Sequence, residues 1–455
     1  MVKLLALPII TAACWLTSSH AFPTLYDHTS SLSSHININD NKNLLAPLYE
    51  VSEPNSISDS YIIILKDHVN SMQADQHFQW VRDTLVKPGM KEDQFQQQQF
   101  LESGIPLGIK HTYGSPNAKF RGYSGKFSSN VVENIRRSPD VAYVERDTMV
   151  YASELQRNAP WGLARISHRD VLTLSTFNKY EYDGNGGEGI QVFVIDTGIN
   201  VDHNDFEGRA SWGITVPEGD VDEDGNGHGS HCAGTIAGKQ HGVAKKATPV
   251  AVKVLRSDGS GSMSGVLAGV TWATERHQNA TMEARASGET YKGAVANMSL
   301  GGGRSVALDM AVNEAVNAGI IFSVAAGNDN SDACNYSPAG AENAITVGAT
   351  NIEDERASFS NFGKCVDVFA PGENILSVWT GAPDATNTIS GTSMAAPHVA
   401  GLAAYFASLE SETPVDPKKI KDKIIQLATE GKLYNIANDT ETPNRLIFND
   451  PPKSS

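Results

Sequence analysis

Short apolar runs alternate with amphipathic stretches along the chain from Trp161 onwards. Short apolar runs bounded by turn-forming residues are typical of buried strands, whereas apolar positions three or four apart indicate helices. The pattern predicts strands at residues 191–195, 249–254, 294–298, 320–325, 344–348 and 366–369. It predicts helices at residues 264–276, 306–317, 393–409 and 417–427. This alternation predicts an α/β fold, a parallel sheet with helices on both faces.

The preceding part of the chain has a different pattern. A strand at 61–65, a helix starting near Asn130 and a strand at 141–144 predict a small α+β domain. Asn130 is suited to cap the helix, because Glu133 follows three residues later. Residues 22–58 are rich in Ser, Asn and Asp and lack periodicity, so we expect a flexible linker there.

The first residues have the parts of a secretory signal peptide. Lys3 supplies the positive charge, residues 4–16 the apolar core, and Ala21 the small residue at a cleavage site. No later stretch reaches the roughly 20 apolar residues needed to cross a bilayer, so we expect no transmembrane segment. We therefore expect residues 1–21 to be removed in the secretory pathway. Both the vacuole lumen and the exterior of the cell remain open as destinations.

Charge and cysteine content narrow the function further. The formal net charge of −16 at pH 7 argues against nucleic-acid binding, which rests on basic surface. Of the four cysteines, Cys14 lies in the expected signal peptide. An odd number remains, so at least one is unpaired or pairs between chains. In an oxidising compartment Cys334 and Cys365 can form a bridge, and the alternative is that these two and Cys232 are all free and buried.

Residues 391–401 carry the candidate nucleophile. They read Gly-Thr-Ser-Met-Ala-Ala-Pro-His-Val-Ala-Gly, which places Ser393 between a glycine turn and an Ala-rich helix. The free N–H groups and the dipole at a helix N-terminus favour an anion. Serine hydrolases need a nucleophilic hydroxyl beside a site for an oxyanion. Ser393 is therefore the candidate nucleophile.

Two upstream residues complete a candidate triad. Asp196 follows the strand at 191–195, where a carboxylate can orient a histidine and stabilise its imidazolium form. His228 lies between two glycines and is the candidate general base. His228 and His231 could together bind a metal ion. However, no third ligand lies nearby in the sequence, and the spacing of the two histidines is not that of zinc proteases. The order Asp, His, Ser along the chain differs from the order in chymotrypsin and in α/β-hydrolase esterases. Such esterases also carry Gly-x-Ser-x-Gly at the nucleophile, whereas this chain reads Gly-Thr-Ser-Met-Ala there, so an esterase of that type is disfavoured.

Other motifs suit the binding of a peptide. Asn328 follows a predicted strand, where its amide could donate to an oxyanion, although turn asparagines are common. Glycine-rich segments at 258–262 and 297–303 let a backbone approach closely, so that an extended peptide could lie between them as an added strand. Neither segment is a phosphate-binding loop, because no Gly-Lys-Ser/Thr follows. Together the motifs predict a serine peptidase.

These motifs closely resemble the subtilisin-like (subtilase) serine proteases of the proteinase K branch, most of all the fungal vacuolar proteinase B (cerevisin) group. The resemblance covers about residues 158–450, from Asn-Ala-Pro-Trp-Gly-Leu-Ala-Arg-Ile-Ser-His at 158–168 to Asn-Arg-Leu-Ile-Phe at 444–448. Residues 60–149 are similar, with weaker motifs, to the ferredoxin-like inhibitor propeptide of these enzymes. The implied organisation is a signal peptide at 1–21, a linker at 22–58, a propeptide at 59–152, a catalytic domain at 153–450 and a tail at 451–455.

The resemblance also implies the roles of site residues. Asp196, His228 and Ser393 would be the triad, and Asn328 with the Ser393 N–H would form the oxyanion hole. The resemblance implies a primary specificity pocket without fixed charge, which would favour substrates with apolar and aromatic side chains. The opposite side of the substrate would contact a second binding edge. The residues implied are Ser299, Leu300, Gly301, Ala325, Ala326 and Gly327 for the pocket, and Gly259, Ser260 and Gly261 for the edge.

A zymogen is implied as well. The propeptide would act as chaperone and intramolecular inhibitor, and cleavage in cis would fall near 150–154 of a monomeric enzyme acting on proteins and peptides. The alternative is a subtilase that keeps its propeptide bound and acts as a binding protein.

No cofactor is implied for the chemistry, but a structural calcium ion is. Its ligands would be the Asp367 carboxylate and carbonyl oxygens around Glu342 and Ala344, since oxygen ligands suit calcium. Cys232 matches the free thiol of this branch, and Cys334 and Cys365 match a pair that is bridged in some relatives. Sequons occur at Asn279, Asn297, Asn335 and Asn438, of which Asn279, in an expected polar loop, is the best candidate for glycosylation.

Overall fold

The computed structural model describes residues 45–49, 56–85, 107–114, 120–148, 153–411, 413–436 and 440–452. The chain divides into two compact units, an N-terminal unit (Met1–Val51 and Ile57–Asp147) and a C-terminal unit (Ser52–Ser56 and Thr148–Ser455). The expected signal peptide, most of the expected linker and residues 150–152 of the expected processing region lie outside the described residues. No helix within the described ranges is both long enough and apolar enough to cross a membrane.

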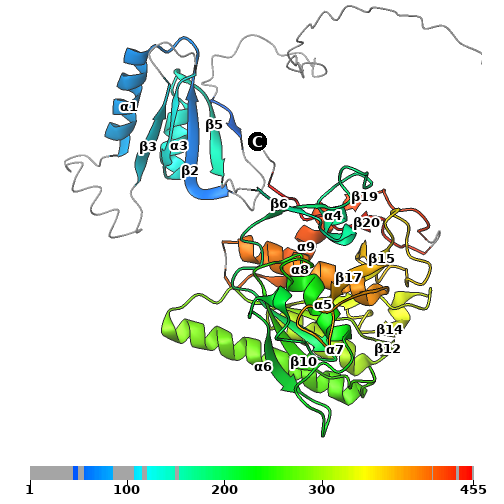
Figure 1. Ribbon diagram of the computed structural model, residues 1–455. Coiled ribbons are helices and arrows are strands. Elements are labelled where there is room, and N and C mark those ends of the chain that lie inside the picture. The colour runs from blue at the N-terminus through cyan, green and yellow to red at the C-terminus, as the bar shows by residue number, and fades with distance from the viewer. Residues whose placement is uncertain are drawn as a thin grey trace, which may run out of the picture. The chain divides into compact units, whose positions relative to one another are not determined.

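The described part of the N-terminal unit contains a five-stranded sheet and the helices α1 and α3 (Figure 1). Its elements are β1 (Leu48–Tyr49), β2 (Ser56–Leu65), α1 (Ser71–Leu85), β3 (Gly108–Tyr113), β4 (Gly122–Lys126), α3 (Ser129–Arg136) and β5 (Val141–Thr148). The strand order is β1-β5-β2-β4-β3, so that β2 to β5 follow the ferredoxin-like βαββαβ arrangement. Tyr61, Ile63, Tyr123 and Phe127 are fully or almost fully buried in its core. The predicted α+β domain is therefore confirmed.

Helix caps in this unit differ in part from the prediction. At α1, the Asn70 side chain accepts from the N–H of Gln73, and the Gln73 side chain accepts from the N–H of Asn70, a reciprocal capping box. The cap predicted for α3 is wrong, because the helix begins two residues earlier than an Asn130 cap implies and Ser128 occupies the cap position. Asn130 is thus inside the first turn, where its side chain cannot cap.

The C-terminal unit is built on a nine-stranded sheet. Its strands, in spatial order, are β19 (Thr429–Glu430), β20 (Arg445–Leu446), β16 (Val368–Pro371), β15 (Ile345–Thr350), β13 (Ile320–Ala325), β11 (Ala294–Met298), β8 (Gln191–Asp196), β10 (Thr248–Lys253) and β9 (Ser211–Thr215). All neighbours are parallel except β19 and β20. All six predicted strands are present. Their continuous apolar character follows from burial on both faces of the sheet.

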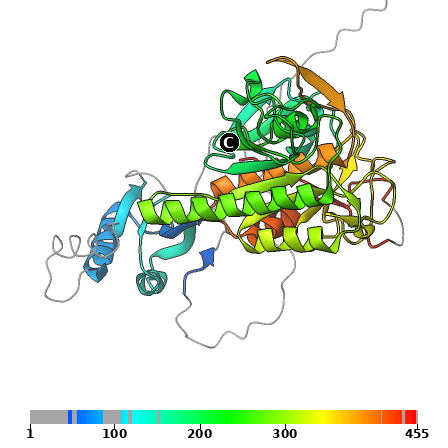
Figure 2. The same ribbon diagram turned by 90° about the horizontal axis from the view of Figure 1, so that it is seen from below.

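Helices cover both faces of this sheet. They are α4 (Trp161–Ile166), α5 (His228–Ala237), α6 (Met263–Ser287), α7 (Val306–Asn317), α8 (Thr392–Leu409) and α9 (Pro417–Leu427). Val192 and Val194 of β8 share one buried cluster with α5 and α8. Phe193 and Ile195, which point the opposite way, share another with α6 and α7. Figure 2 shows α6 as the long green helix.

Short paired strands and 3-10 turns complete the C-terminal unit. The pairs are β6 (Ser153–Arg157) with β7 (Lys179–Asp183), β12 (Gly302–Gly303) with β14 (Tyr336–Ser337), and β17 (Ile375–Val378) with β18 (Thr386–Ile389). The turns are η1 (Asn204–Phe206) and η2 (Ala333–Asn335).

Helix α6 is longer than predicted. The predicted helix ended at residue 276, but α6 continues to Ser287 and is closed by Gly288, whose φ is +74°. The added segment, residues 277–287, contains three alanines and no Gly or Pro, which favours helix. Asn279 therefore lies on the exposed surface of a helix, so the expected polar loop around this sequon is wrong.

Candidate active site

Asp196 and His228 are paired at the carboxyl end of β8. Asp196 is the last residue of β8 and fully buried, and His228 is the first residue of α5. Asp196 Oδ1 lies 2.8 Å from His228 Nδ1 and accepts from the N–H of Thr197 at 2.7 Å. Burial lowers the pKa of His228, whereas the charge and hydrogen bond of Asp196 raise it, and the charge of Asp224 raises it further. The net effect is a pKa above the ordinary value of histidine. A histidine so held keeps Nδ1 occupied and leaves Nε2 for proton transfer.

A second buried carboxylate, Asp224, fixes the start of α5. Its Oδ1 accepts from the Thr197 hydroxyl and the Gly227 N–H, each at 2.9 Å. Its Oδ2 accepts from the N–H and hydroxyl of Ser230 at 2.9 and 2.6 Å. A negative charge is favoured at a helix N-terminus. Asp224 was not among the predicted site residues, although it lies only four residues before the candidate base His228.

Ser393 lies in the first turn of α8 and exchanges hydrogen bonds with Ser299. The Ser393 hydroxyl donates to the Ser299 carbonyl at 3.0 Å, and the Ser299 hydroxyl donates to the Ser393 carbonyl at 2.7 Å. No hydrogen bond joins Ser393 to His228 among the described residues. Rotation about the Cα–Cβ bond of Ser393 changes the partner of its hydroxyl, and catalytic hydrogen bonds often tighten only when substrate is bound.

The Ser393 carbonyl needs partners from outside its helix. Its acceptor position would normally be used by the N–H of residue 397, but Pro397 has none. The Ser299 hydroxyl supplies one donor, and the Cys232 thiol, 3.4 Å away, supplies a second. Burial, with the nearby Asp196 charge, raises the pKa of Cys232 well above its usual value, so this free cysteine is a thiol rather than a thiolate.

Asn328 is oriented by the residue that precedes the nucleophile. Its Oδ1 accepts from the N–H of Thr392 at 2.8 Å and from the Thr392 hydroxyl at 2.9 Å. The same hydroxyl accepts from the N–H of Gly327 at 3.1 Å. With the amide oxygen held by two donors, Nδ2 is the end of Asn328 that can donate to a ligand. The Ser393 N–H, in the first turn of α8, has no acceptor within the helix.

The loop that carries Asn328 is held by Asn361, which is fully buried. Asn361 Oδ1 accepts from the N–H groups of Asp329 and Ser331, both at 3.0 Å, and Nδ2 donates to the Ala326 carbonyl at 2.9 Å. Gly327 has φ +104°, and a Cβ there would lie 2.3 Å from Asn361 Nδ2. This loop therefore requires glycine and has little freedom to move. No sequence pattern indicated Asn361.

A cavity of about 510 Å³ opens beside His228. It brings together six of the predicted substrate-binding residues, but Ala325, Ala326 and Gly327 are not in its lining. The six are Gly259, Ser260, Gly261, Ser299, Leu300 and Gly301. Leu255, Met263, Val266 and Leu308 complete the apolar part of the wall. No acidic or basic side chain other than His228 lines it, which suits an apolar ligand.

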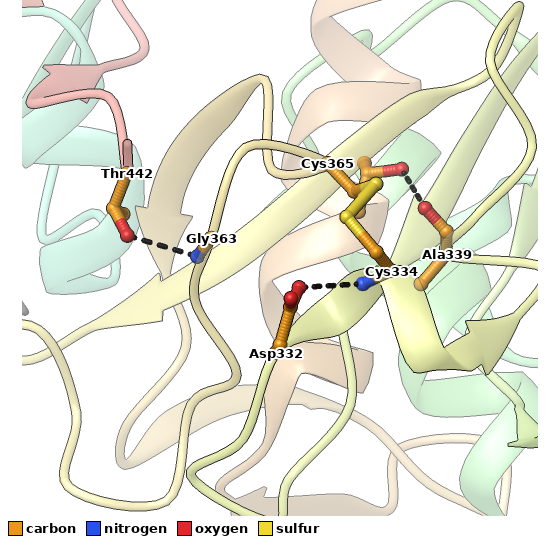
Figure 3. Close-up of a disulfide and its surroundings, with 7 residues drawn as sticks. Asp332, Cys334, Ala339, Gly363, Cys365 and Thr442 are labelled. Carbon is orange, nitrogen blue, oxygen red and sulfur yellow. Dashed lines mark hydrogen bonds between the residues drawn. A yellow bond between two sulfur atoms is a disulfide. The ribbon is translucent and has the colours of Figure 1, made fainter. Parts of the chain in front are cut away.

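A disulfide joins Cys334 and Cys365 close to the Asn328 loop (Figure 3). It links η2 to the segment that leads into β16, with a Cα–Cα distance of 5.3 Å. Hydrogen bonds hold both sides: Asp332 accepts from the Cys334 N–H at 3.0 Å, and Thr442 accepts from the Gly363 N–H at 2.8 Å. The bridge therefore ties together the two segments that carry Asn328 and Asn361.

The expected calcium ligands do converge, but on a lysine. The Asp367 carboxylate and the carbonyl oxygens of Glu342 and Ala344 surround Lys421 Nζ at 3.0, 3.0 and 2.6 Å. These ligands therefore do not offer calcium a free position. Lys421 was not among the predicted site residues.

Within the described ranges, one group of acidic, histidine and cysteine side chains is close enough to share a metal ion. It consists of Asp196, His228 and Cys232, whose ligand atoms lie within 4.8 Å of one another. Asp196 and His228 are already bonded to each other. His231, considered above as a metal partner, has Nε2 2.8 Å from the Ile375 carbonyl, and burial lowers its pKa to about 3.

Comparisons with known proteins agree with this geometry. Residues 187–445 match the subtilase family of peptidases, and residues 60–153 match the peptidase inhibitor I9 family. A subtilisin-like protease of Coccidioides posadasii is 55% identical over 89% of this chain and 83% of its own length. Alkaline protease 2 of Aspergillus fumigatus is 54% identical over the same shares of the two chains. The crystal structure of a cold-adapted subtilisin-like serine proteinase superposes with a TM-score of 0.56 and 42% identity, covering 66% of this chain and 100% of that one.

Proposed function

The chain belongs to the subtilase family of serine proteases and carries an I9 propeptide, and we propose that it is an endopeptidase whose triad is Asp196, His228 and Ser393. The observation that carries this assignment is the 2.8 Å pairing of the fully buried Asp196 carboxylate with His228 Nδ1, while the candidate nucleophile Ser393 lies in the first turn of α8. His228 thereby faces substrate with Nε2, the nitrogen that can act as general base. The chemistry needs no cofactor.

The proposed reaction proceeds through an acyl-enzyme. His228 removes the Ser393 proton while Oγ attacks the peptide carbonyl carbon, and Asp196 stabilises the imidazolium that forms. The oxyanion accepts hydrogen bonds from Asn328 Nδ2 and the Ser393 N–H. His228 then gives its proton to the leaving amine. Water, deprotonated by His228, attacks the acyl carbon and releases Ser393.

Protein and peptide substrates of broad sequence are proposed, with a preference for apolar and aromatic side chains. Support comes from the cavity between residues 259–261 and 299–301, whose lining has no acidic side chain, no basic one other than His228, and the apolar residues Leu255, Met263, Val266 and Leu308. The glycines on both sides expose backbone groups to which an extended peptide can pair as an added strand. Ala325, Ala326 and Gly327 would form the remaining wall of the primary specificity pocket.

The enzyme is proposed to be made as an autoprocessed zymogen that works as a monomer. We propose a signal peptide at 1–21, a linker at 22–58, a propeptide at 59–152, a catalytic domain at 153–450 and a tail at 451–455. The I9 match at 60–153 and the subtilase match at 187–445 support this division. The propeptide would fold the catalytic domain and inhibit it until cleavage near 150–154. The Cys334–Cys365 disulfide supports an oxidising destination, the vacuole lumen or the cell exterior.

The test is hydrolysis in trans of a peptide anilide with Phe before the scissile bond. Purified wild type should cleave it, Ser393→Ala should not, and a serine-directed sulfonyl fluoride should abolish the wild-type activity. A wild type that has cut itself near residue 150 yet lacks activity in trans would favour the binding protein instead. In a host without other proteases, Ser393→Ala should remain an uncleaved precursor, and a cleaved one would refute self-processing.

A further inference from the structure

We propose that the Lys421 ammonium is the resident cation of the site formed by Asp367, Glu342 and Ala344, and that this site does not use calcium. The expectation of calcium rested on the same three residues, and the structure gives them a different partner. The proposal goes beyond the protease activity, because it concerns what stabilises the fold.

The three oxygens match an ammonium group in number and distance. Lysine Nζ carries three N–H donors and no acceptor. It lies 3.0 Å from Asp367 Oδ2, 3.0 Å from the Glu342 carbonyl and 2.6 Å from the Ala344 carbonyl, as expected for charge-assisted hydrogen bonds. Each donor therefore has one acceptor. The pair is also largely shielded from water, since the side chains of Lys421 and Asp367 are 19% and 21% exposed.

The same arrangement disfavours calcium. Calcium takes about six to eight oxygen ligands at roughly 2.3–2.6 Å. The three oxygens that converge here already accept hydrogen bonds from Lys421 Nζ, so they are not free to bind calcium. One carboxylate balances one ammonium, whereas a divalent ion would leave an excess positive charge. Asp367 Oδ2 is further committed, because it accepts from the N–H of Thr346 at 2.9 Å. A calcium ion could enter only if the Lys421 side chain left.

The lysine connects three parts of the C-terminal unit. It lies on α9, between the buried Ile420 and Ile424, while Ala344 precedes β15 and Asp367 precedes β16. Lys418 of the same helix differs, since its side chain is 78% exposed and pairs with Asp422 on the surface, whereas Lys423 is shielded like Lys421 but pairs with Glu410. The ammonium thus joins the helix to the turn before β15 and to the segment before β16, which also carries Cys365 of the disulfide. A cation supplied by the chain cannot be removed by a chelator.

Thermal unfolding of the full chain tests this, in a Ser393→Ala background that prevents autolysis. The midpoint is measured by calorimetry in EDTA and in calcium for this parent, for Lys421→Ala and for the surface control Lys418→Ala. In EDTA we expect the Lys421→Ala midpoint to fall by several degrees and the Lys418→Ala midpoint to stay close to that of the parent. Equal midpoints for the two lysine variants would overturn the proposal.

The Asp367→Asn variant tests calcium directly and remains decisive should Lys421→Ala fail to fold. The quantity compared is the rise in midpoint between EDTA and calcium. We expect the same rise, whatever its size, in the parent and in Asp367→Asn, because any calcium bound elsewhere is unaffected. If calcium raises the parent midpoint and Asp367→Asn loses that rise, calcium occupies this site and the proposal is wrong.

Discussion

Replacement of Thr392 by valine should slow catalysis through Asn328 without touching the triad. Thr392 is fully buried, and its hydroxyl donates to Asn328 Oδ1 at 2.9 Å while accepting from the Gly327 N–H at 3.1 Å. Valine keeps the shape of the side chain and removes both bonds. Asn328 then retains one donor, the Thr392 N–H at 2.8 Å.

The size of the effect follows from these contacts. A typical hydrogen bond contributes about 0.5–1.5 kcal/mol net, and each 1.4 kcal/mol is about tenfold in rate, so loss of one of the two bonds that orient Asn328 predicts a fall of about 2- to 12-fold. Loss of the amide itself sets the upper limit, about 100- to 1,000-fold for the corresponding subtilisin asparagine, which is a published measurement on that enzyme. The fall should appear in kcat, because the oxyanion exists only in the transition state.

Initial rates on the Phe anilide give kcat and KM for wild type, Thr392→Val and Thr392→Ser. Serine keeps the hydroxyl, so Thr392→Ser should remain within about twofold of wild type, well inside the range of one hydrogen bond. A double-mutant cycle with Asn328→Leu tests whether Thr392 acts through Asn328. In the Asn328→Leu background, where the amide is absent, Thr392→Val should lower kcat little further. Equal losses in both backgrounds, or a rise in KM alone, would refute the reasoning.

Two further predictions concern charge and covalent structure. Asp224→Asn removes a negative charge that raises the pKa of His228. Because His228 must be neutral to act as a base, the acid limb of the kcat/KM profile should move to lower pH. The control Glu223→Gln, at an exposed position, should leave that limb in place. An unmoved limb in Asp224→Asn would contradict this. The Cys334–Cys365 bridge joins residues 31 positions apart in the chain. In the Ser393→Ala background, the double variant Cys334→Ala/Cys365→Ala should lose roughly 3–4 kcal/mol of unfolding free energy, measured by denaturant titration. Cys232→Ala is the control for replacing a cysteine outside the bridge. An unchanged midpoint would count against the loop-closure account.

The sequence by itself determined the fold class and the set of candidate residues proposed for the chemistry. Buried parallel strands are continuous apolar runs, so β8, β11 and β13 could be located without knowing their neighbours. The candidate site residues stand where those strands and two helices end or begin, and local motifs mark such positions. Asp196, His228, Asn328 and Ser393 could therefore be named as a set, and the structure brings Asp196 and His228 into contact.

Tertiary structure alone decided which groups support that set. Asn361 meets the Asn328 loop, and Lys421 meets Asp367, across separations in the chain that no local pattern encodes. Lys421 stands in a lysine-rich helix in which Lys418 is exposed and Lys423 pairs with Glu410, so only the packing of α9 shows that Lys421 reaches Asp367. Motifs report what a residue can do chemically, whereas a partner distant in sequence is fixed only when the chain is packed. For that reason the resemblance to subtilases suggested calcium beside Asp367, whereas the fold places a lysine there.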